Sequence, residues 1–188
     1  MTLLNNFVMQ APRPLPVIVA VDRSGSMSRN GKIDALNMAL RDFIKSIKEE
    51  ESEVDIKISL FSFGGDNAIC ELPLTSVKEI DPDTYLFQAH GRTPMGQVFT
   101  MIKEMIEDRN IVTSRSYKPT LVLLTDGIPT DDYKKPLEKL INNGRSQKSF
   151  RIAMAIGDDA DKNMLSAFVS SPELLVSGIM LPPIWTGW

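Results

Sequence analysis

Apolar residues are arranged along this chain in two alternating patterns. In one pattern they form short runs rich in Val, Ile and Leu that end at polar or glycine-containing turns, which is typical of buried strands. In the other they recur every three or four positions between charged residues, which is typical of amphipathic helices. We predict strands over 16–21, 54–60, 120–124 and 150–156, and helices over 33–47, 98–106, 131–143 and 164–168.

Weaker patterns lie between these elements. The stretch AICELPL, over 68–74, follows a glycine turn and predicts a short edge strand paired through that turn. Residues 75–93 are irregular, so we expect a brief helical turn and a long loop there. Gly144 follows the third helix and is expected to be its left-handed cap. A last strand is expected at 174–176.

Strands alternating with helices predict an α/β fold with an open, mostly parallel, doubly wound, Rossmann-like sheet that carries helices on both faces. The length of 188 residues, of which 43% are hydrophobic, suits one domain with a substantial core. We place this domain at 15–178, between an N-terminal extension over 1–14 and an irregular Pro/Trp tail over 179–188. The methionines at helical spacing are interpreted as core filling.

Charge and cysteine content limit the possible partners. The formal net charge is -3 at pH 7 and no basic cluster stands out, so we do not expect nucleic-acid binding. Cys70 is the lone cysteine, which excludes an internal disulfide and a cysteine metal cage, and we interpret it as a small core residue. No apolar run is long enough to cross a bilayer, and the first residues lack the pattern of a secretory signal, so we expect a cytoplasmic protein.

Polar side chains stand at the ends of two predicted strands and in the loop between them. Asp22, Ser24 and Ser26 follow the first strand, Thr93 lies in the long loop, and Asp126 follows TLVLLT. The first and fourth strands of an open parallel sheet are often neighbours at the switch point, so Asp22 and Asp126 are expected side by side on one rim. Side chains that offer only oxygen suit Mg²⁺ or Mn²⁺ and do not suit structural zinc. We therefore predict a divalent metal site at these five residues.

The segments DRSGS, GRTPMG and LLTDG resemble the metal-ion-dependent adhesion site of von Willebrand factor type A domains. That family has Asp-x-Ser-x-Ser after its first strand, a Thr in a later loop and Asp-Gly after its fourth strand. The resemblance runs from about 16 to 178. It implies that Ser24, Ser26 and Thr93 touch the cation through hydroxyls, while Asp22 and Asp126 act mainly through bridging waters or a switched direct contact. DGIPTDD and AIGDDAD look most like small bacterial members associated with tellurium resistance and stress response.

The resemblance implies a metal-dependent protein–protein interaction module without catalysis. Neutral hydroxyls donate little charge, so a dication that they hold stays electrophilic and favours an Asp or Glu carboxylate from a partner protein. The alternative is a metal-dependent phosphoester hydrolase. Against it, Ser24 stands where a phosphatase of the haloacid dehalogenase type needs a second Asp, and neither Ser24 nor Ser26 lies in Gly-x-Ser-x-Gly. No P-loop or Rossmann fingerprint is present.

Several other polar residues are interpreted as structural. Asp131 and Asp132 are expected to be N-terminal acids of the helix that follows them, where the helix dipole favours negative charge. Ser28 or Asn30 is a candidate cap for the first helix. His90 is interpreted as a surface residue, because no Asp partner or nucleophile accompanies it.

Two C-terminal features complete the sequence prediction. Asp158, Asp159 and Asp161 predict a solvated turn rather than a second cation site. The end of the chain, GIMLPPIWTGW, departs from the family, and we expect the family's final helix to be missing here. The apolar sheet face that such a helix covers needs protection, so we expect a homo-oligomer or a protein that depends on a partner.

Overall fold

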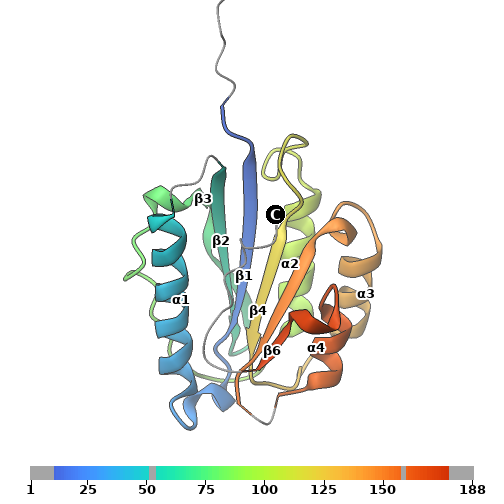
Figure 1. Ribbon diagram of the computed structural model, residues 1–188. Coiled ribbons are helices and arrows are strands. Elements are labelled where there is room, and N and C mark those ends of the chain that lie inside the picture. Colours follow the sequence, from blue (N-terminus) through green and yellow to red (C-terminus); the bar gives the residue numbers. More distant parts are fainter. Residues whose placement is uncertain (1–10, 51–53, 158–159, 178–188) are drawn as a thin grey trace, which may run out of the picture.

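The computed structural model describes residues 11–50, 54–157 and 160–177, in which helices flank one six-stranded sheet (Figure 1). The strands are β1 Pro14–Asp22, β2 Asp55–Gly64, β3 Asn67–Ser76, β4 Thr120–Thr125, β5 Phe150–Ala155 and β6 Leu175–Ser177. Their order is β3-β2-β1-β4-β5-β6, and all pairings are parallel except that of β3 with β2. The helices are α1 Lys32–Glu49, α2 Met95–Glu107, α3 Lys134–Asn142 and α4 Lys162–Phe168. The predicted fold class is confirmed.

Strand β1 runs through the middle of the sheet, and its side chains alternate between two hydrophobic cores. Val17, Val19 and Val21 pack with α1 on one face. Ile18 and Ala20 pack with α2, α3 and α4 on the other face. These five residues are at most 2% exposed. Burial on both faces explains why this strand is an uninterrupted apolar run in the sequence.

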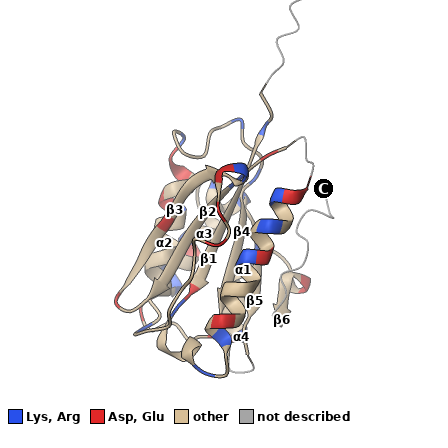
Figure 2. Ribbon diagram, turned by 90° about the vertical axis from the view of Figure 1, so that its left-hand side faces the viewer, with Lys and Arg blue, Asp and Glu red and all other residues tan. Residues whose placement is uncertain are grey.

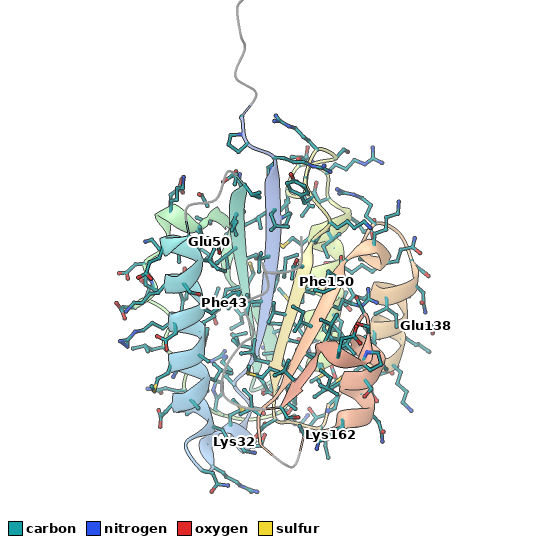
Figure 3. The ribbon with its side chains drawn as sticks, in the orientation of Figure 1. Lys32, Phe43, Glu50, Glu138, Phe150 and Lys162 are labelled. Carbon is teal, nitrogen blue, oxygen red and sulfur yellow. The ribbon has the colours of Figure 1, made fainter. Side chains whose placement is uncertain are left out.

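The apolar residues of helix α1 recur on one side of the helix, and that side is buried. Leu36, Leu40, Phe43, Ile44 and Ile47 are buried, and Phe43 lies between the helix and the sheet (Figure 3). Lys, Arg, Asp and Glu segments mark the outer side of the helix (Figure 2). The amphipathic pattern therefore reports which side of α1 faces the core.

The weaker predicted elements are also present. The edge strand is β3, antiparallel to β2 and longer than predicted. A short 3-10 turn over 77–79 begins the irregular stretch, and Gly144 has a φ of 71°, as expected for a left-handed cap. The last strand is β6, one residue later than predicted.

Two local predictions are wrong. Cys70 is exposed rather than buried, because it lies on β3 at the edge of the sheet. The N-cap position of α1 is Gly31, with a φ of 68° and no side-chain hydrogen bond, so neither Ser28 nor Asn30 caps this helix. The Ser28 hydroxyl instead donates to the Gly25 carbonyl at 2.7 Å, within its own turn.

Some predictions fall outside the described residues. These are the tail over 179–188 with the missing final helix, most of the extension over 1–14, and the pair Asp158 and Asp159. Within the described ranges, no helix combines the length and the apolar character needed to cross a membrane.

Candidate metal centre

The parallel pairing of β1 with β4 brings two aspartates to the same edge of the sheet. Val21 of β1 is aligned with Leu124 of β4, so Asp22 and Asp126 follow at neighbouring strand ends. Asp22 is 0% exposed and Asp126 is 2% exposed. Two buried carboxylates at one rim need partners, because an isolated buried charge is strongly disfavoured.

Hydroxyl groups connect the two aspartates. The Asp22 carboxylate accepts the Ser24 backbone N–H at 2.8 Å and the Thr125 hydroxyl at 2.5 Å. The hydroxyls of Ser24 and Ser26 are 3.0 Å apart, and Ser26 Oγ donates to Asp126 Oδ1 at 2.7 Å. Four of the five predicted residues are thus joined by one continuous chain of hydrogen bonds, and we call their side chains with that of Thr93 the oxygen cluster.

Thr93 completes the cluster next to Gly127. A Cβ atom placed on Gly127 would lie 3.0 Å from Asp22 Oδ2 and 3.4 Å from Thr93 Oγ1. The absence of a side chain at this position therefore leaves room for both oxygens. The structure brings all five predicted residues together.

Two glycines allow the loop before Thr93 to touch the turn after β2. Gly65, which follows β2, forms an isolated bridge with Gly91 in the loop before Thr93. Their φ values are 71° and 68°, and a Cβ atom on Gly91 would lie 2.3 Å from Gly65 Cα. Only glycine permits so close an approach of two backbones in this conformation.

Backbone hydrogen bonds join the same loop to the turn after β1. The His90 N–H donates to the Arg23 carbonyl at 2.8 Å, and the Gly25 N–H donates to the Gly91 carbonyl at 2.9 Å. The residue His90 is exposed, and its Nδ1 lies 3.4 Å from the Gln88 carbonyl. His90 is a surface residue, as predicted, and it contributes to the site through its backbone.

Residues after Asp126 hold Thr93 from the other side. The Thr93 N–H donates to Thr130 Oγ1, and the Thr130 N–H donates to the Thr93 carbonyl, both at 3.0 Å. The Asp131 carboxylate accepts the N–H groups of Gly96 and Gln97 at 2.9 and 3.1 Å. Asp131 therefore satisfies the first N–H groups of α2, the helix that begins directly after Thr93.

The interpretation of Asp131 and Asp132 as acids at the start of their own helix is wrong. Helix α3 begins only at Lys134, and the negative charge of Asp131 lies at the N-terminus of α2 instead. Asp161 does cap the helix that follows it, because it accepts the N–H groups at the start of α4 at 3.1 Å. Both Asp131 and Asp161 thus serve helix ends, but the sequence could not show which helix Asp131 serves.

Burial alters the ionisation of Asp22. Desolvation raises the pKa of this carboxyl from 3.8 to about 6, and the nearby Asp126 adds to the increase, although hydrogen bonds from Thr125 and Ser24 lower the pKa. The ionised form is therefore disfavoured in the protein alone. A bound cation would favour it, because an opposite charge stabilises the carboxylate.

A lysine outside the three motif segments also lies in the site. Lys32 Nζ donates to Asp126 Oδ2 at 2.7 Å, and the two side chains are 8% and 0% exposed. Figure 3 shows Lys32 at the start of α1, at the end of the molecule where β1 and β4 end. The motif spacing did not point to Lys32, because a lysine just before an amphipathic helix is usually a surface residue.

The side chains fit a hard divalent cation. Three hydroxyls and two carboxylates converge, and all donor atoms are oxygen, as Mg²⁺ and Mn²⁺ prefer. Ser26 is only partly buried, whereas the other four residues are at most 5% exposed, so the cluster reaches the surface at Ser26. In the described part of the chain, no group of three or more His, Cys, Asp and Glu side chains could hold a metal ion. A cation in this cluster would therefore depend on the hydroxyls.

The fold is similar to that of several solved structures. Proximal thread matrix protein 1 from the mussel byssus, in its crystal form 2, has a TM-score of 0.72 at 17% identity, over 91% of this chain and 45% of that one. The same protein, described with a zinc-occupied MIDAS motif (MIDAS is the metal-ion-dependent adhesion site), has a TM-score of 0.67 at 18% identity, over 89% of this chain and 41% of that one. The pilus adhesin SpaC from Lactobacillus rhamnosus GG has a TM-score of 0.70 at 16% identity, over 91% and 29%.

These proteins are longer than the present chain, which spans less than half the length of each. Identities of 16 to 18% show a common fold and no more. No curated protein sequence matches the chain.

The family assignment rests on the sequence as a whole. The model of the von Willebrand factor type A domain family matches residues 17–178. This range includes the turn after β1, the loop of Thr93 and the turn after β4, so the match covers the oxygen cluster as well as the sheet. The chain therefore belongs to the von Willebrand factor type A domain family.

Proposed function

We propose that this protein binds a divalent cation through Asp22, Ser24, Ser26, Thr93 and Asp126 and uses it to bind an acidic group of a protein partner. The observation that carries the proposal is the continuous chain of hydrogen bonds that runs from Asp22 through both serines to Asp126. Membership of the family supports a metal-dependent interaction and adhesion module. Mg²⁺ or Mn²⁺ is the cation that we propose, because all the donors are hard oxygen atoms.

The mixture of donors favours an external carboxylate. Hydroxyls leave most of a dication's charge uncompensated, and the cluster reaches the surface at Ser26. The bound cation would supply a positive, directional contact for a carboxylate oxygen. The protein's own residues hold the cation, exclude water on the buried side and leave the exposed side accessible to the partner.

Three arginines on the same loops support an acidic partner. Arg23 precedes Ser24, Arg92 precedes Thr93, and the Arg29 N–H donates to the Ser26 carbonyl at 3.2 Å. Within the described ranges, no side-chain hydrogen bond or ion pair is formed by these arginines, and Arg23 Nε is buried without a partner. Their positive charge would attract an acidic surface and raise the rate of association.

A hydrolase has less support from the structure. Hydrolysis needs a general base or nucleophile within hydrogen-bond reach of the substrate. The nearby His90 is exposed and turned toward the Gln88 carbonyl. The Asp131 carboxylate is engaged with the N-terminus of α2. We therefore propose cation-dependent binding of a protein partner, and not hydrolysis, as the function.

Two segments of the sequence bear on the biological role of the protein. DGIPTDD and AIGDDAD resemble small bacterial family members linked to tellurium resistance and stress response. On that resemblance we propose a role in a bacterial stress operon, with a partner protein encoded nearby. Loss of tellurite tolerance on deletion of the gene, and its rescue by the wild-type protein but not by Asp22→Ala, would support this role.

Isothermal titration calorimetry with Mg²⁺ and Mn²⁺ tests the site directly. We expect one cation per chain for the wild-type protein and a loss of binding of at least about tenfold for Asp22→Ala and Ser24→Ala, since each change removes an oxygen from the cluster. Ser28→Ala is the matched control, because its hydroxyl bonds only within the turn after β1. Equal cation affinity in all four proteins would rule out the site.

Partner binding needs a second measurement. The protein immobilised in Mg²⁺ should retain a partner from extract of its source cells and release it on addition of chelator, and Asp126→Ala should retain none. A partner that stays bound in chelator would show that recognition does not pass through the cation.

A further inference from the structure

Lys32 brings a positive charge into the proposed cation site. Its ammonium lies 2.7 Å from Asp126 Oδ2, while the other oxygen of the same carboxylate accepts the Ser26 hydroxyl at 2.7 Å. Both oxygens of Asp126 are therefore engaged in the protein alone. A dication that approaches Asp126 would meet the positive charge of Lys32 next to the carboxylate.

The position of Lys32 is unfavourable for the helix that carries it. Lys32 is the first residue of α1, where the helix dipole is positive and favours acidic side chains over basic ones. The residue is also 7% exposed, and lysine is almost never buried without a pairing charge. The helix dipole and burial therefore both disfavour this ammonium, and the ion pair with Asp126 offsets these two effects. Helix stability does not explain why a lysine stands here.

The ammonium also changes the charge that a cation encounters. Asp22 and Asp126 attract a cation to the oxygen cluster by their negative charges, and the ammonium of Lys32 next to Asp126 opposes that attraction. Buried charges that are in direct contact, as those of Lys32 and Asp126 are, interact strongly because little water screens them. The positive N-terminus of α1 acts in the same direction.

We infer that the positive charge of Lys32 weakens cation binding at the oxygen cluster, so that the cation is held firmly only when a partner's carboxylate adds its negative charge. This inference rests on the proposed function and extends it to regulation. Cation and partner would then bind cooperatively, since each raises the affinity for the other by the same factor. The protein without its partner would exchange its cation readily.

Replacing the ammonium without losing the shape of the side chain tests the inference. Lys32→Met should raise the affinity for Mn²⁺, measured by calorimetry and by the electron paramagnetic resonance signal of free Mn²⁺, by about 10- to 100-fold. Lys32→Arg keeps the positive charge and should bind Mn²⁺ as weakly as the wild type. Lys45→Gln, which removes a lysine from α1 away from the cluster, should leave the affinity unchanged.

The outcomes separate this inference from the proposed function. If Lys32 only orients Asp126, Lys32→Met will bind Mn²⁺ more weakly than the wild type, and the inference is overturned while the metal site stands. An unchanged affinity overturns it equally. If neither protein binds Mn²⁺, the proposed metal site itself fails. Should Lys32→Met fold poorly, Lys32→Gln and the Mn²⁺-induced rise in melting temperature provide the same comparison.

Discussion

Asp22 is the residue at which stability and the proposed function conflict. Its carboxylate is fully buried, and burial raises its pKa to about 6. Near neutral pH the protein alone therefore holds an ionised group that its surroundings disfavour. Strain of this kind is expected at a functional site, because a cation would remove it on binding.

Asp22→Asn should therefore stabilise the protein in the presence of chelator. Asparagine can still accept the Ser24 N–H but carries no charge, so we expect a gain of about 2 kcal/mol in the free energy of unfolding at pH 7. The same variant should bind no Mn²⁺. Urea unfolding with chelator measures the first effect, and calorimetry measures the second.

The pH dependence gives a further check on Asp22. A raised pKa means that this residue contributes stability below pH 3.8, which is lost as the pH rises through 6. The advantage of Asp22→Asn should accordingly shrink as the pH falls from 7 to 4. Asp42→Asn, a change on the outer side of α1, should have an effect within about 0.5 kcal/mol. If Asp22→Asn proves less stable than the wild type at pH 7 in chelator, burial does not disfavour the ionised carboxylate as we expect.

At the scale of elements, the ends of two strands and the loops beside them position the donors. Strand β1 ends in Asp22 and Asp126 directly follows β4, the turn after β1 supplies the hydroxyls of Ser24 and Ser26, and the loop before α2 supplies that of Thr93. The contact of Gly65 with Gly91 sets how closely the loop of Thr93 approaches the end of β2. The site depends on this contact although neither glycine offers a side chain.

Two glycine substitutions separate backbone strain from a steric clash. Gly31 and Gly91 both have a φ of 68°. A Cβ atom on Gly31 meets nothing within 4 Å, whereas one on Gly91 would lie 2.3 Å from Gly65 Cα. We expect Gly31→Ala to cost about 1 kcal/mol of unfolding free energy and Gly91→Ala at least about 3 kcal/mol.

Chemical denaturation of both variants measures the difference. Gly91→Ala should also weaken Mn²⁺ binding, because Thr93 follows it by two residues. Equal losses of stability for the two variants would mean that the loops do not need this close approach.

At the scale of the whole molecule, Glu107 joins parts of the chain that are far apart in sequence. It ends α2, and its carboxylate accepts the N–H groups of Arg145 and Ser146 and the ammonium of Lys103 at 2.8 to 3.2 Å. Desolvation alone would raise its pKa, but these hydrogen bonds outweigh it and lower the pKa from 4.5 to about 2. The ionised group therefore fastens α2 to the loop after α3.

Glu107→Gln should destabilise the protein by about 1–2 kcal/mol at pH 7, a figure reduced for the partial exposure of this side chain. A lowered pKa contributes stability that is complete above pH 4.5 and is lost as the pH falls through 2. The difference between wild type and variant should therefore shrink over that range. Glu104→Gln, an exposed change on the same helix, should show no such pH dependence in urea unfolding.

Much of the architecture could be predicted because it depends on local patterns. The apolar run over 17–21 and the spacing of Leu36, Leu40 and Phe43 reflect which sides of β1 and α1 are buried. Cys70 could not be placed in this way, because its strand lies at the open edge of the sheet and none of its residues is buried. Its apolar neighbours, such as Ile69 at 41% exposed, show how far an edge strand can depart from the pattern of a core strand.

The sequence by itself determined the alternation of strands and helices and placed five oxygen-bearing residues at positions where a parallel sheet gathers them. Their use in binding a cation is a prediction for experiment. The tertiary structure alone decided that Lys32 pairs with Asp126 across 94 residues, and that Asp131 caps α2 rather than its own helix. The physical reason is the separation along the chain between the residues that interact. Periodicity records whether each residue faces water or core, whereas these partnerships arise only when packing brings distant loops to the same edge of the sheet.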